Sequence, residues 1–273
     1  MPAPRYAIIT GSASGLGRAL AVRLARDGWH LGLADVDHAR NAETLRLAEA
    51  AGGSGQLEPL DVASASQWQA LAARLQQAWP RLDLLVNNAG VAASGAVGNA
   101  PLDDWRWLLE VNLWGVIHGC HTFVPWLKAN PQGAHVINVA SLAGLIAAPE
   151  MGTYCVAKAG VVALSEAMYA ELRGADVGVT VVCPGFFPTN LGDRARFGDE
   201  VHREFFDRIN ERSRLTADAV AEAAVRGMRR KKLYVVVPRR ARVLWRLKRW
   251  MPMVIARLLA WDYARRAADE SAG

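Results

Sequence analysis

Short apolar runs alternate with longer amphipathic segments along this chain. Seven runs have the length and apolar content of strands: Tyr6–Thr10, His30–Ala34, Gln56–Leu60, Leu82–Asn87, His135–Ala140, Val177–Cys183 and Leu233–Val237. Between them, segments such as Gly15–Asp27, Ser64–Trp79 and Tyr154–Arg173 repeat apolar residues at intervals of three and four, as amphipathic helices do. Strands that alternate with helices imply right-handed crossovers and a parallel sheet covered on both faces. The pattern predicts one doubly wound α/β domain with a seven-stranded parallel sheet.

The predicted sheet ends near residue 238, and the chain continues as a tail over residues 239–273. No internal repeat, low-complexity tract or Ser/Gly-rich linker interrupts residues 1–238, which we interpret as one domain. The tail is predicted to form two short helices separated by Pro252. Apolar residues stand there among cations: Val243, Leu244, Leu247, Val254, Ile255, Leu258, Leu259 and Trp261 beside Arg240, Arg242, Arg246, Lys248 and Arg249. The tail is therefore a basic amphipathic helical extension.

Composition narrows the class of protein. Of 273 residues, 52% are hydrophobic and 21% charged, which excludes a disordered chain. No run approaches the roughly 18 uncharged apolar residues of a membrane-spanning helix. Cys120, Cys155 and Cys183 are widely spaced, so we expect buried thiols in a reducing compartment, with neither disulfides nor a metal site. The first strand starts at Tyr6, which leaves no room for a signal peptide and predicts a cytoplasmic protein.

Charge is distributed unevenly. The net charge is +6, but the last 48 residues hold 14 Lys and Arg against 3 Asp and Glu, so the preceding 225 residues are acidic. An acidic body argues against a nucleic-acid partner. Two interpretations of the tail stay open. It packs over the substrate cleft or a neighbouring subunit, or it lies on a membrane surface, because arginine beside tryptophan is typical of interfacial helices.

A glycine-rich turn, GSASGLG, follows the first strand over Gly11–Gly17. Gly11 can take the tight turn, Gly15 lets a pyrophosphate approach the backbone, and Gly17 lets the helix pack closely on the sheet. The amide groups at the start of the helix, around Ser14 and Leu16, then face the phosphates. The turn predicts a dinucleotide site.

Asp35 ends the second predicted strand, 18 residues beyond Gly17. A carboxylate at this place accepts hydrogen bonds from both ribose hydroxyls of NAD and repels the 2′-phosphate of NADP. No Lys or Arg occurs between Gly11 and Gly17, and Val36 follows the aspartate, so we find no cation for that phosphate. Asp37 is the competing carboxylate, and it can instead cap the next helix. The sequence favours NAD over NADP.

Five further features complete a recognisable set. They are Asn87-Asn-Ala-Gly90, Asn112, Ser141, Tyr154-Cys-Val-Ala-Lys158 and Pro184-Gly185. Together with the glycine turn, and in this order and spacing, they resemble the short-chain dehydrogenase/reductase family over about residues 5–238. The resemblance implies a Rossmann fold, a nicotinamide cofactor, oxidoreductase activity on an alcohol or ketone, and a homodimer or homotetramer.

Tyr154 and Lys158 lie four residues apart on a predicted helix and share one face. A nearby ammonium stabilises the phenolate, so we expect it to lower the tyrosine pKa from about 10 toward the working pH. Ser141, at the end of the fifth strand, can donate a hydrogen bond to a substrate oxygen. The resemblance implies that Tyr154 exchanges the alcohol proton, Lys158 also holds the nicotinamide ribose, Ser141 orients the carbonyl and Asn112 anchors a water.

The resemblance also implies further cofactor contacts. Asp61 and Val62 resemble the adenine-binding pair of the family, although Asp61 can also cap the following helix. Backbone of Asn88, Ala89 and Gly90 lies near the adenosine ribose. After the sixth strand, Pro184, Gly185, the backbone of Phe187 and the hydroxyl of Thr189 grip the carboxamide. The family has a small β-branched residue where this chain has Phe187, which changes the local shape.

Substrate contacts are expected from Ala143–Met151 and from the segment between Phe186 and Thr216. Beside Ser141 and Tyr154 we select Ala143, Met151 and Phe186. Phe197, Phe205 and Phe206 add aromatic character, which suits a lipophilic alcohol or ketone, although they can equally be packing residues. The alternatives are an NADPH-dependent 3-oxoacyl reductase and a non-catalytic dinucleotide-binding scaffold.

Overall fold

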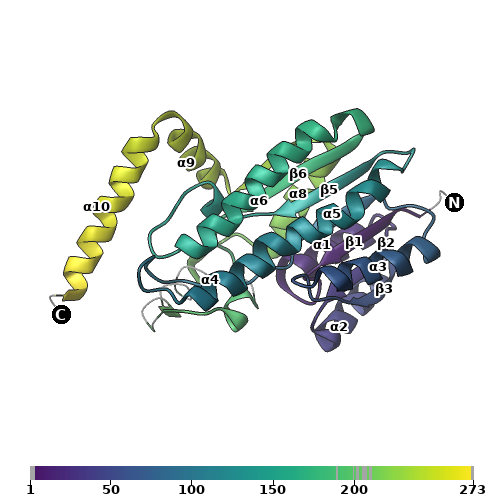
Figure 1. Ribbon diagram of the computed structural model, residues 1–273, viewed down its shortest axis with the longest axis horizontal. Helices are drawn as coiled ribbons and strands as arrows, with labels where there is room; N and C mark the ends of the chain where they lie inside the picture. Colours follow the sequence, from purple (N-terminus) through teal and green to yellow (C-terminus); the bar gives the residue numbers. More distant parts are fainter. Residues whose placement is uncertain are drawn as a thin grey trace.

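The computed structural model describes residues 4–188, 190–198, 200, 203–204, 208 and 211–271 (Figure 1). Its seven strands are all parallel, in the order β3-β2-β1-β4-β5-β6-β7. The strands are β1 (Tyr6–Thr10), β2 (His30–Asp35), β3 (Ser54–Pro59), β4 (Leu84–Asn87), β5 (Ala134–Val139), β6 (Val177–Pro184) and β7 (Tyr234–Val237). The order reverses between β1 and β4, which is the switch point where doubly wound sheets bind ligands. The predicted single domain with a seven-stranded parallel sheet is confirmed.

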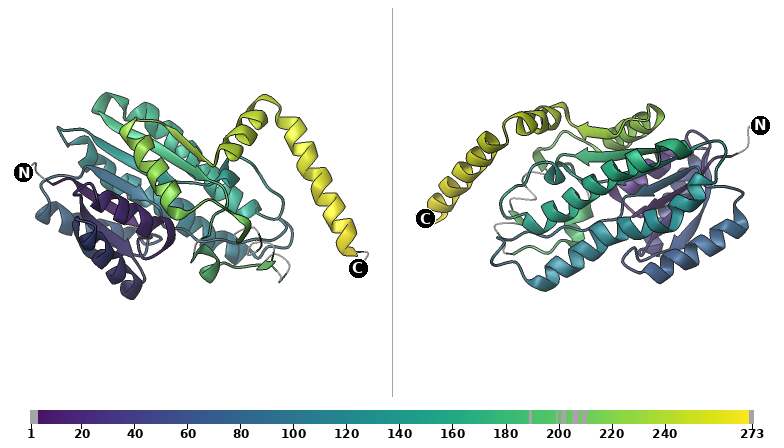
Figure 2. Two further views of the ribbon diagram at one scale, coloured as in Figure 1. Left: turned by 180° about the vertical axis from the view of Figure 1, so that it is seen from behind. Right: turned by 45° about the horizontal axis from the view of Figure 1, so that its top comes forward.

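Helices cover both faces of the sheet. They are α1 (Gly15–Ala25), α2 (His38–Ala50), α3 (Ala65–Ala78), α4 (Leu102–Leu109), α5 (Gly115–Lys128), α6 (Gly152–Glu171), α8 (Ala217–Arg229), α9 (Arg239–Trp250) and α10 (Pro252–Ser271). Alternate residues of β1 point to opposite sides: Ile8 packs with α3, α5 and α6, whereas Ala7 and Ile9 pack with α1 and α8. Figure 2, from behind, shows α1 and α8 on that second face. Both faces are therefore buried.

Most element boundaries differ from the sequence prediction by one or two residues, and two differences are informative. The third strand is Ser54–Pro59 rather than Gln56–Leu60, because β3 pairs with β2 by backbone hydrogen bonds from His30↔Ser54 onward. The second tail helix, α10, has 20 residues and is not short. Pro252 begins this helix at its first position, where the missing amide proton costs nothing.

A polar network joins the middle strands under α5 and α6. The Asn87 side chain donates to Asn138 Oδ1 at 2.9 Å and to Cys120 Sγ at 3.3 Å, and Asn138 donates to Ser165 Oγ at 3.0 Å. These groups are buried, and their mutual hydrogen bonds offset part of the cost of burying them. Asn87 thus ties β4 to β5 just before the loops that carry the site. The three cysteines are free and buried, as predicted.

His135 makes folding sensitive to acid. Burial and the charge of Lys231 lower its pKa to about 4, and its Nε2 atom lies 2.8 Å from Thr180 Oγ1. In the unfolded chain the pKa is near 6.5, so the unfolded chain binds a proton that the folded chain refuses, and stability falls as the pH falls through this window. Between pH 7 and pH 5 we expect this histidine to lower the free energy of unfolding by about 2 kcal/mol, and His135→Gln should abolish that loss. Urea unfolding of the wild type, this variant and the control His38→Gln at both pH values measures it. Equal losses in all three proteins would contradict the assignment, because His38 is exposed.

The tail leaves the body at β7. Trp245 of α9 stacks on Tyr234 of β7 with ring centres 4.7 Å apart, and Lys248 Nζ donates to the Leu145 carbonyl at 2.8 Å. Beyond α9, α10 projects away from the sheet in both views of Figure 2. Within the described residues, no helix has the combination of length and apolar character needed to cross a membrane.

Candidate active site

The glycine-rich turn opens a cavity of about 550 Å³ at the carboxyl ends of β1, β2 and β4. Gly11 and Gly15 have φ angles of +64° and +52°, which L-residues with side chains rarely adopt. A Cβ on Gly17 would lie 2.0 Å from the Gly11 carbonyl oxygen, so this glycine is required where α1 folds back on the turn. Gly17 itself packs there and does not line the cavity.

The first turn of α1 suits an anion. The side chain of Ser14, its N-cap residue, accepts no capping hydrogen bond, and no acidic residue lies in the first turn. By contrast, Asp37, Ser64 and Thr216 cap α2, α3 and α8. Among the described residues, the amide groups at the start of α1 thus have no side-chain acceptor, and they lie next to a cavity lined by Ser14, Gly15 and Leu16. These residues fit the pyrophosphate of a dinucleotide.

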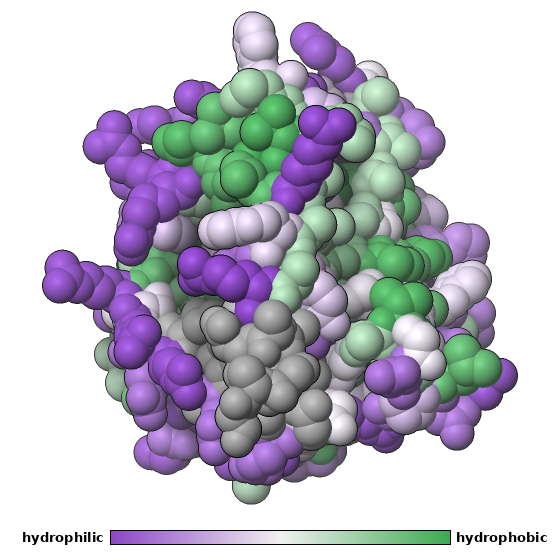
Figure 3. Space-filling model, turned by 90° about the vertical axis from the view of Figure 1, so that its left-hand side faces the viewer, coloured by the Kyte–Doolittle hydropathy of each residue, from purple (hydrophilic) through white to green (hydrophobic). Residues whose placement is uncertain are grey.

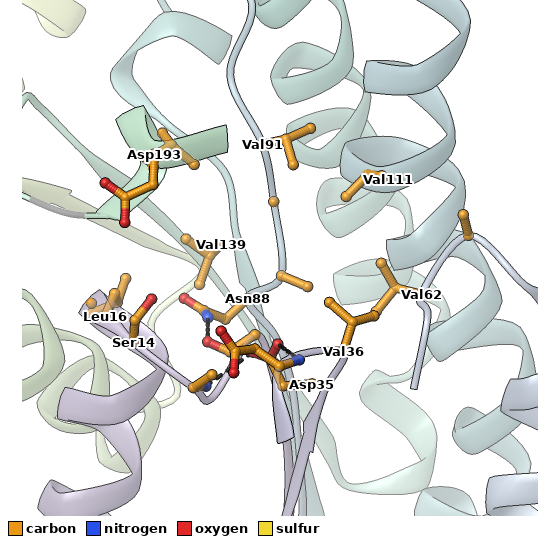
Figure 4. A pocket seen from close by; sticks show the side chains of 18 of the residues that line it. Ser14, Leu16, Asp35, Val36, Val62, Asn88, Val91, Val111, Val139 and Asp193 are labelled. Atoms are coloured by element: carbon orange, nitrogen blue, oxygen red, sulfur yellow. Dashed lines mark hydrogen bonds between the residues drawn. The ribbon is translucent and has the colours of Figure 1, made fainter. Parts of the chain in front are cut away.

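Asp35 is fixed by the backbone on both sides. Its Oδ2 accepts from the Ala13 amide and its Oδ1 from the Asp37 amide, each at 2.9 Å. Figure 4 shows its carboxylate among the side chains that line the cavity. Asp37 caps α2 by accepting from the Arg40 amide at 3.1 Å, as the competing interpretation proposed for that residue. Asp35 therefore presents an oriented carboxylate at the end of β2.

The loop after β4 is fastened to the glycine turn. Thr10 Oγ1 accepts from the amides of Asn88 and Ala89 at 2.9 and 3.0 Å, and the Asn88 side chain donates to the carbonyls of Thr10 and Gly11. The Asn88 side chain is held by these hydrogen bonds. Asn88, Ala89 and Gly90 line the cavity, so the loop would contact a ribose through their backbone.

Most of the predicted cofactor residues line this one cavity. They are Gly11, Ser14, Gly15, Leu16, Asp35, Asp61, Val62, Asn88, Ala89, Gly90, Tyr154, Lys158, Pro184 and Phe187. Asp61 does not cap α3, since Ser64 does, and its Oδ1 accepts from the Ala63 amide instead. Gly185 lines a neighbouring cavity and donates its amide to the Val237 carbonyl. Thr189 lies outside the described residues, as do Phe205 and Phe206.

Tyr154, Lys158 and Ser141 meet where β5 ends. Lys158 Nζ donates to the Val139 carbonyl at 3.0 Å and lies 5.8 Å from the centre of the Tyr154 ring. A Cβ on Gly90 would lie 3.5 Å from Lys158 Nζ and 3.1 Å from Asn112 Oδ1, so these two groups converge around one glycine. The structure therefore brings all four predicted catalytic residues to one end of the sheet.

The expected lowering of the Tyr154 pKa is not found. Burial raises the pKa of Tyr154 to about 12, and its hydrogen bond with Ser141 opposes only part of that effect. Burial also lowers the pKa of Lys158 to about 8. The sequence prediction assumed an ammonium that acts directly on the phenol. In the structure the ammonium bonds to the Val139 carbonyl, and desolvation dominates both groups.

Asn112 lies in a five-residue π-helical segment, Glu110–Trp114, between α4 and α5. Its Oδ1 accepts from the Val91 amide and its Nδ2 donates to the Val91 carbonyl, both at 2.8 Å. Such π-segments interrupt helices frequently at functional sites. These two hydrogen bonds fix the orientation of the Asn112 side chain against Val91.

A second cavity, of about 240 Å³, adjoins the first one. The five predicted substrate residues line it: Ser141, Ala143, Met151, Tyr154 and Phe186. Its other lining residues are Ala92, Leu142, Ile146, Ala148, Pro184, Gly185, Phe187 and Leu191. Ser141 and Tyr154 supply its only polar side chains among the residues described. No described residue of α9 or α10 lines either cavity, so the described part of the tail does not cover the substrate site.

Sequence reasoning missed several lining residues. Val139 and Ala140 directly precede Ser141, so the rule that ligands bind at strand ends could have found them. Arg40 does not follow a strand, so that rule could not have found it. It lies on α2 and contacts Asp193 Oδ2 at 3.4 Å and Asp37 Oδ2 at 3.7 Å. The expectation that no cation lies near Asp35 is therefore incomplete.

Comparisons with known proteins agree with this geometry. The family model "short chain dehydrogenase" matches residues 5–198. The chain is 34% identical over 267 residues to "Putative oxidoreductase SadH" of Mycobacterium tuberculosis. The aligned region covers 96% of this chain and 96% of SadH. It is 32% identical over 255 residues to "Probable oxidoreductase EphD" of the same species, 90% of this chain but only 43% of EphD.

A solved structure is similar as a whole. It is a short chain dehydrogenase/reductase from Burkholderia phymatum in complex with NAD, 34% identical, with a TM-score of 0.85 over 90% of this chain and 93% of that one. Fold, family model and relatives lead to one assignment. The chain belongs to the short chain dehydrogenase family of oxidoreductases.

Proposed function

We propose that this protein is an NAD-dependent oxidoreductase that interconverts a lipophilic secondary alcohol and its ketone. One observation carries the proposal: Tyr154 lines both the dinucleotide cavity and the apolar cavity. A substrate carbon that binds next to the Tyr154 hydroxyl therefore also lies next to the end of the dinucleotide cavity. A hydride donor and its acceptor have to meet at such a junction.

The protein residues move and hold the proton. The bound nicotinamide supplies the hydride acceptor or donor. During reduction the Tyr154 hydroxyl donates its proton to the ketone oxygen, and during oxidation the Tyr154 phenolate takes the proton of the alcohol, while Ser141 donates a hydrogen bond to the substrate oxygen. Lys158, with its pKa lowered to about 8, lies beside Tyr154 and is placed to hold the ribose and pass the proton onward. Asn112 fixes the loop at Val91 through two hydrogen bonds and so positions the cavity wall.

The lining of the second cavity argues for a lipophilic substrate. Apart from Ser141 and Tyr154 it is formed by alanine, leucine, isoleucine, methionine, proline, glycine and phenylalanine. A sugar or a charged acid would leave polar groups unpaired against these walls, which costs free energy. An apolar substituent on either side of the carbonyl instead removes apolar surface from water.

The oriented carboxylate of Asp35 supports NAD. Both of its oxygens are held by backbone amides, so it cannot turn away from a bulky anion without breaking hydrogen bonds. NADP would bring a phosphate against this charge. The NAD complex of the similar Burkholderia phymatum protein is consistent with the proposal. A non-catalytic scaffold would need neither Tyr154 nor Ser141 at the cavity junction.

The proposal is tested with purified protein and a series of secondary alcohols with NAD. We expect kcat/KM to rise by about threefold or more for each methylene added beside the carbinol, until the cavity is filled. Polyols and hydroxy acids should turn over poorly. Phe186→Ala is the matched variant, because Phe186 is half-exposed and lines the cavity. It should raise KM for the longer alcohols and leave kcat little changed. A preference for polyols or hydroxy acids over lipophilic alcohols would reject the proposal, and so would the absence of turnover with any alcohol.

A further inference from the structure

The tail carries an apolar stripe that the described part of the body leaves exposed. We define the tail stripe by Val243, Leu247 and Trp250 of α9 and by Val254, Leu258 and Trp261 of α10. Within each helix these residues recur at intervals of three and four, so they share one side. Trp250 is 87% exposed and Trp261 62% exposed. So much apolar surface on two adjacent helices indicates a binding surface.

Cations border the tail stripe. Residues 239–273 contain nine Lys and Arg against three Asp and Glu. Arg265 lies 5.3 Å from the centre of the ring of Trp261, which belongs to the tail stripe. Figure 3 looks onto the face that carries the tail and shows apolar side chains gathered beside protruding hydrophilic ones. Indole rings beside long cationic side chains suit the zone between lipid headgroups and acyl chains.

We propose that the tail stripe docks on an anionic lipid surface. The helices would lie in the plane of the interface, with Leu258 and Trp261 inserted and the cations among the headgroups. They would not cross the bilayer, since no described helix has the character of a membrane span. Each cation near a negatively charged surface adds to the attraction.

A second copy of the chain is the competing occupant of this surface. Two tails packed on one another would bring the cations of both together, and like charges in contact oppose association. An anionic bilayer instead neutralises the cations while it buries the apolar residues. The charge of the tail therefore favours lipid as the partner.

The position of the tail connects docking with the candidate active site. Lys248 of α9 donates to the carbonyl of Leu145 at 2.8 Å, and this loop supplies Leu142, Ala143 and Ile146 to the apolar cavity. Docking would therefore hold that cavity close to the lipid surface, from which a lipophilic alcohol could enter. This last step depends on the proposed function, whereas the docking itself does not.

Vesicle flotation of the full chain tests the proposal. We compare vesicles of phosphatidylcholine with vesicles that also contain phosphatidylglycerol, at low and high salt. Binding is expected only with the anionic lipid and should weaken with salt. Leu258→Asp and Arg257→Glu should each lower the partition coefficient by about tenfold or more.

Two control variants make the same chemical changes elsewhere. Leu102→Asp alters a leucine that is 69% exposed, against 56% for Leu258, and Arg46→Glu reverses an exposed charge on α2. Both should bind vesicles like the wild type, and so should Tyr154→Phe, which separates docking from catalysis. Failure of the wild type to bind anionic vesicles would overturn the proposal. If Leu258→Asp instead reduces the molar mass measured by light scattering, the tail binds a second copy.

Discussion

Tyr154→Phe should lower kcat by roughly a thousandfold, because the variant keeps the ring but loses the group that exchanges the proton with the substrate oxygen. Tyr154 is buried, and its pKa is raised to about 12 by desolvation, so an apolar ring of the same shape fits the site without unfolding it. NAD affinity should stay within about threefold of the wild type, because the rest of the dinucleotide cavity is unchanged.

Tyr169→Phe is the matched control for this variant. Tyr169 lies on the same helix, α6, but it is partly exposed and lines neither cavity. Its activity should equal that of the wild type. The measurements are initial rates with NAD and a lipophilic alcohol, and quenching of tryptophan fluorescence by NADH. A Tyr154→Phe enzyme that keeps most of its turnover would refute the role of the hydroxyl, even if both proteins bind NADH equally.

The position of the site could be predicted from the sequence because its residues follow strands. Gly11, Asp35, Ser141 and Gly185 lie at the ends of β1, β2, β5 and β6 or within two residues after them. In a parallel sheet those ends meet at one edge, and apolar runs locate them well. The helical spacing of Tyr154 and Lys158 then placed both side chains on one face. These inferences need only periodicity and topology.

Residues that reach the site from helices carried no comparable signal. Arg40 on α2 and Trp107 on α4 line the dinucleotide cavity, but nothing in their local sequence says which helical turn overhangs it. The pKa of Tyr154 depends on how completely the hydroxyl is buried and on where the Lys158 ammonium points. Both are properties of tertiary packing, which a single sequence does not contain.

The error in the predicted boundaries of the third strand has a different cause. β3 lies at the edge of the sheet and begins with Ser54 and Gly55, so its first residues carry no apolar pattern. Backbone hydrogen bonds to β2 alone define its beginning. Edge strands can therefore be longer than their apolar runs suggest, and this one starts two residues earlier.

Asp35→Ala should invert the cofactor preference. The variant loses charge-assisted hydrogen bonds to the ribose hydroxyls, so the Kd for NADH should rise by about tenfold or more. It also loses the charge that repels a 2′-phosphate. Arg40 lines the same cavity, where it pairs with Asp193 at 3.4 Å and Asp37 at 3.7 Å, and we expect this cation to attract an added anion. The Kd for NADPH should therefore fall by about tenfold.

Two companion variants separate the causes. Asp35→Asn keeps an acceptor for one of the two backbone amides, so it tests the charge with less disturbance of the turn than alanine causes. If Arg40 supplies the attraction, the double variant Asp35→Ala with Arg40→Ala should show a smaller fall in the Kd for NADPH than Asp35→Ala alone. Fluorescence quenching by NADH and NADPH measures all four proteins on one scale. A wild type that already binds NADPH more tightly would show that Arg40 outweighs Asp35, and the cofactor proposal would then be wrong, because a fixed carboxylate that repels phosphate is its main support.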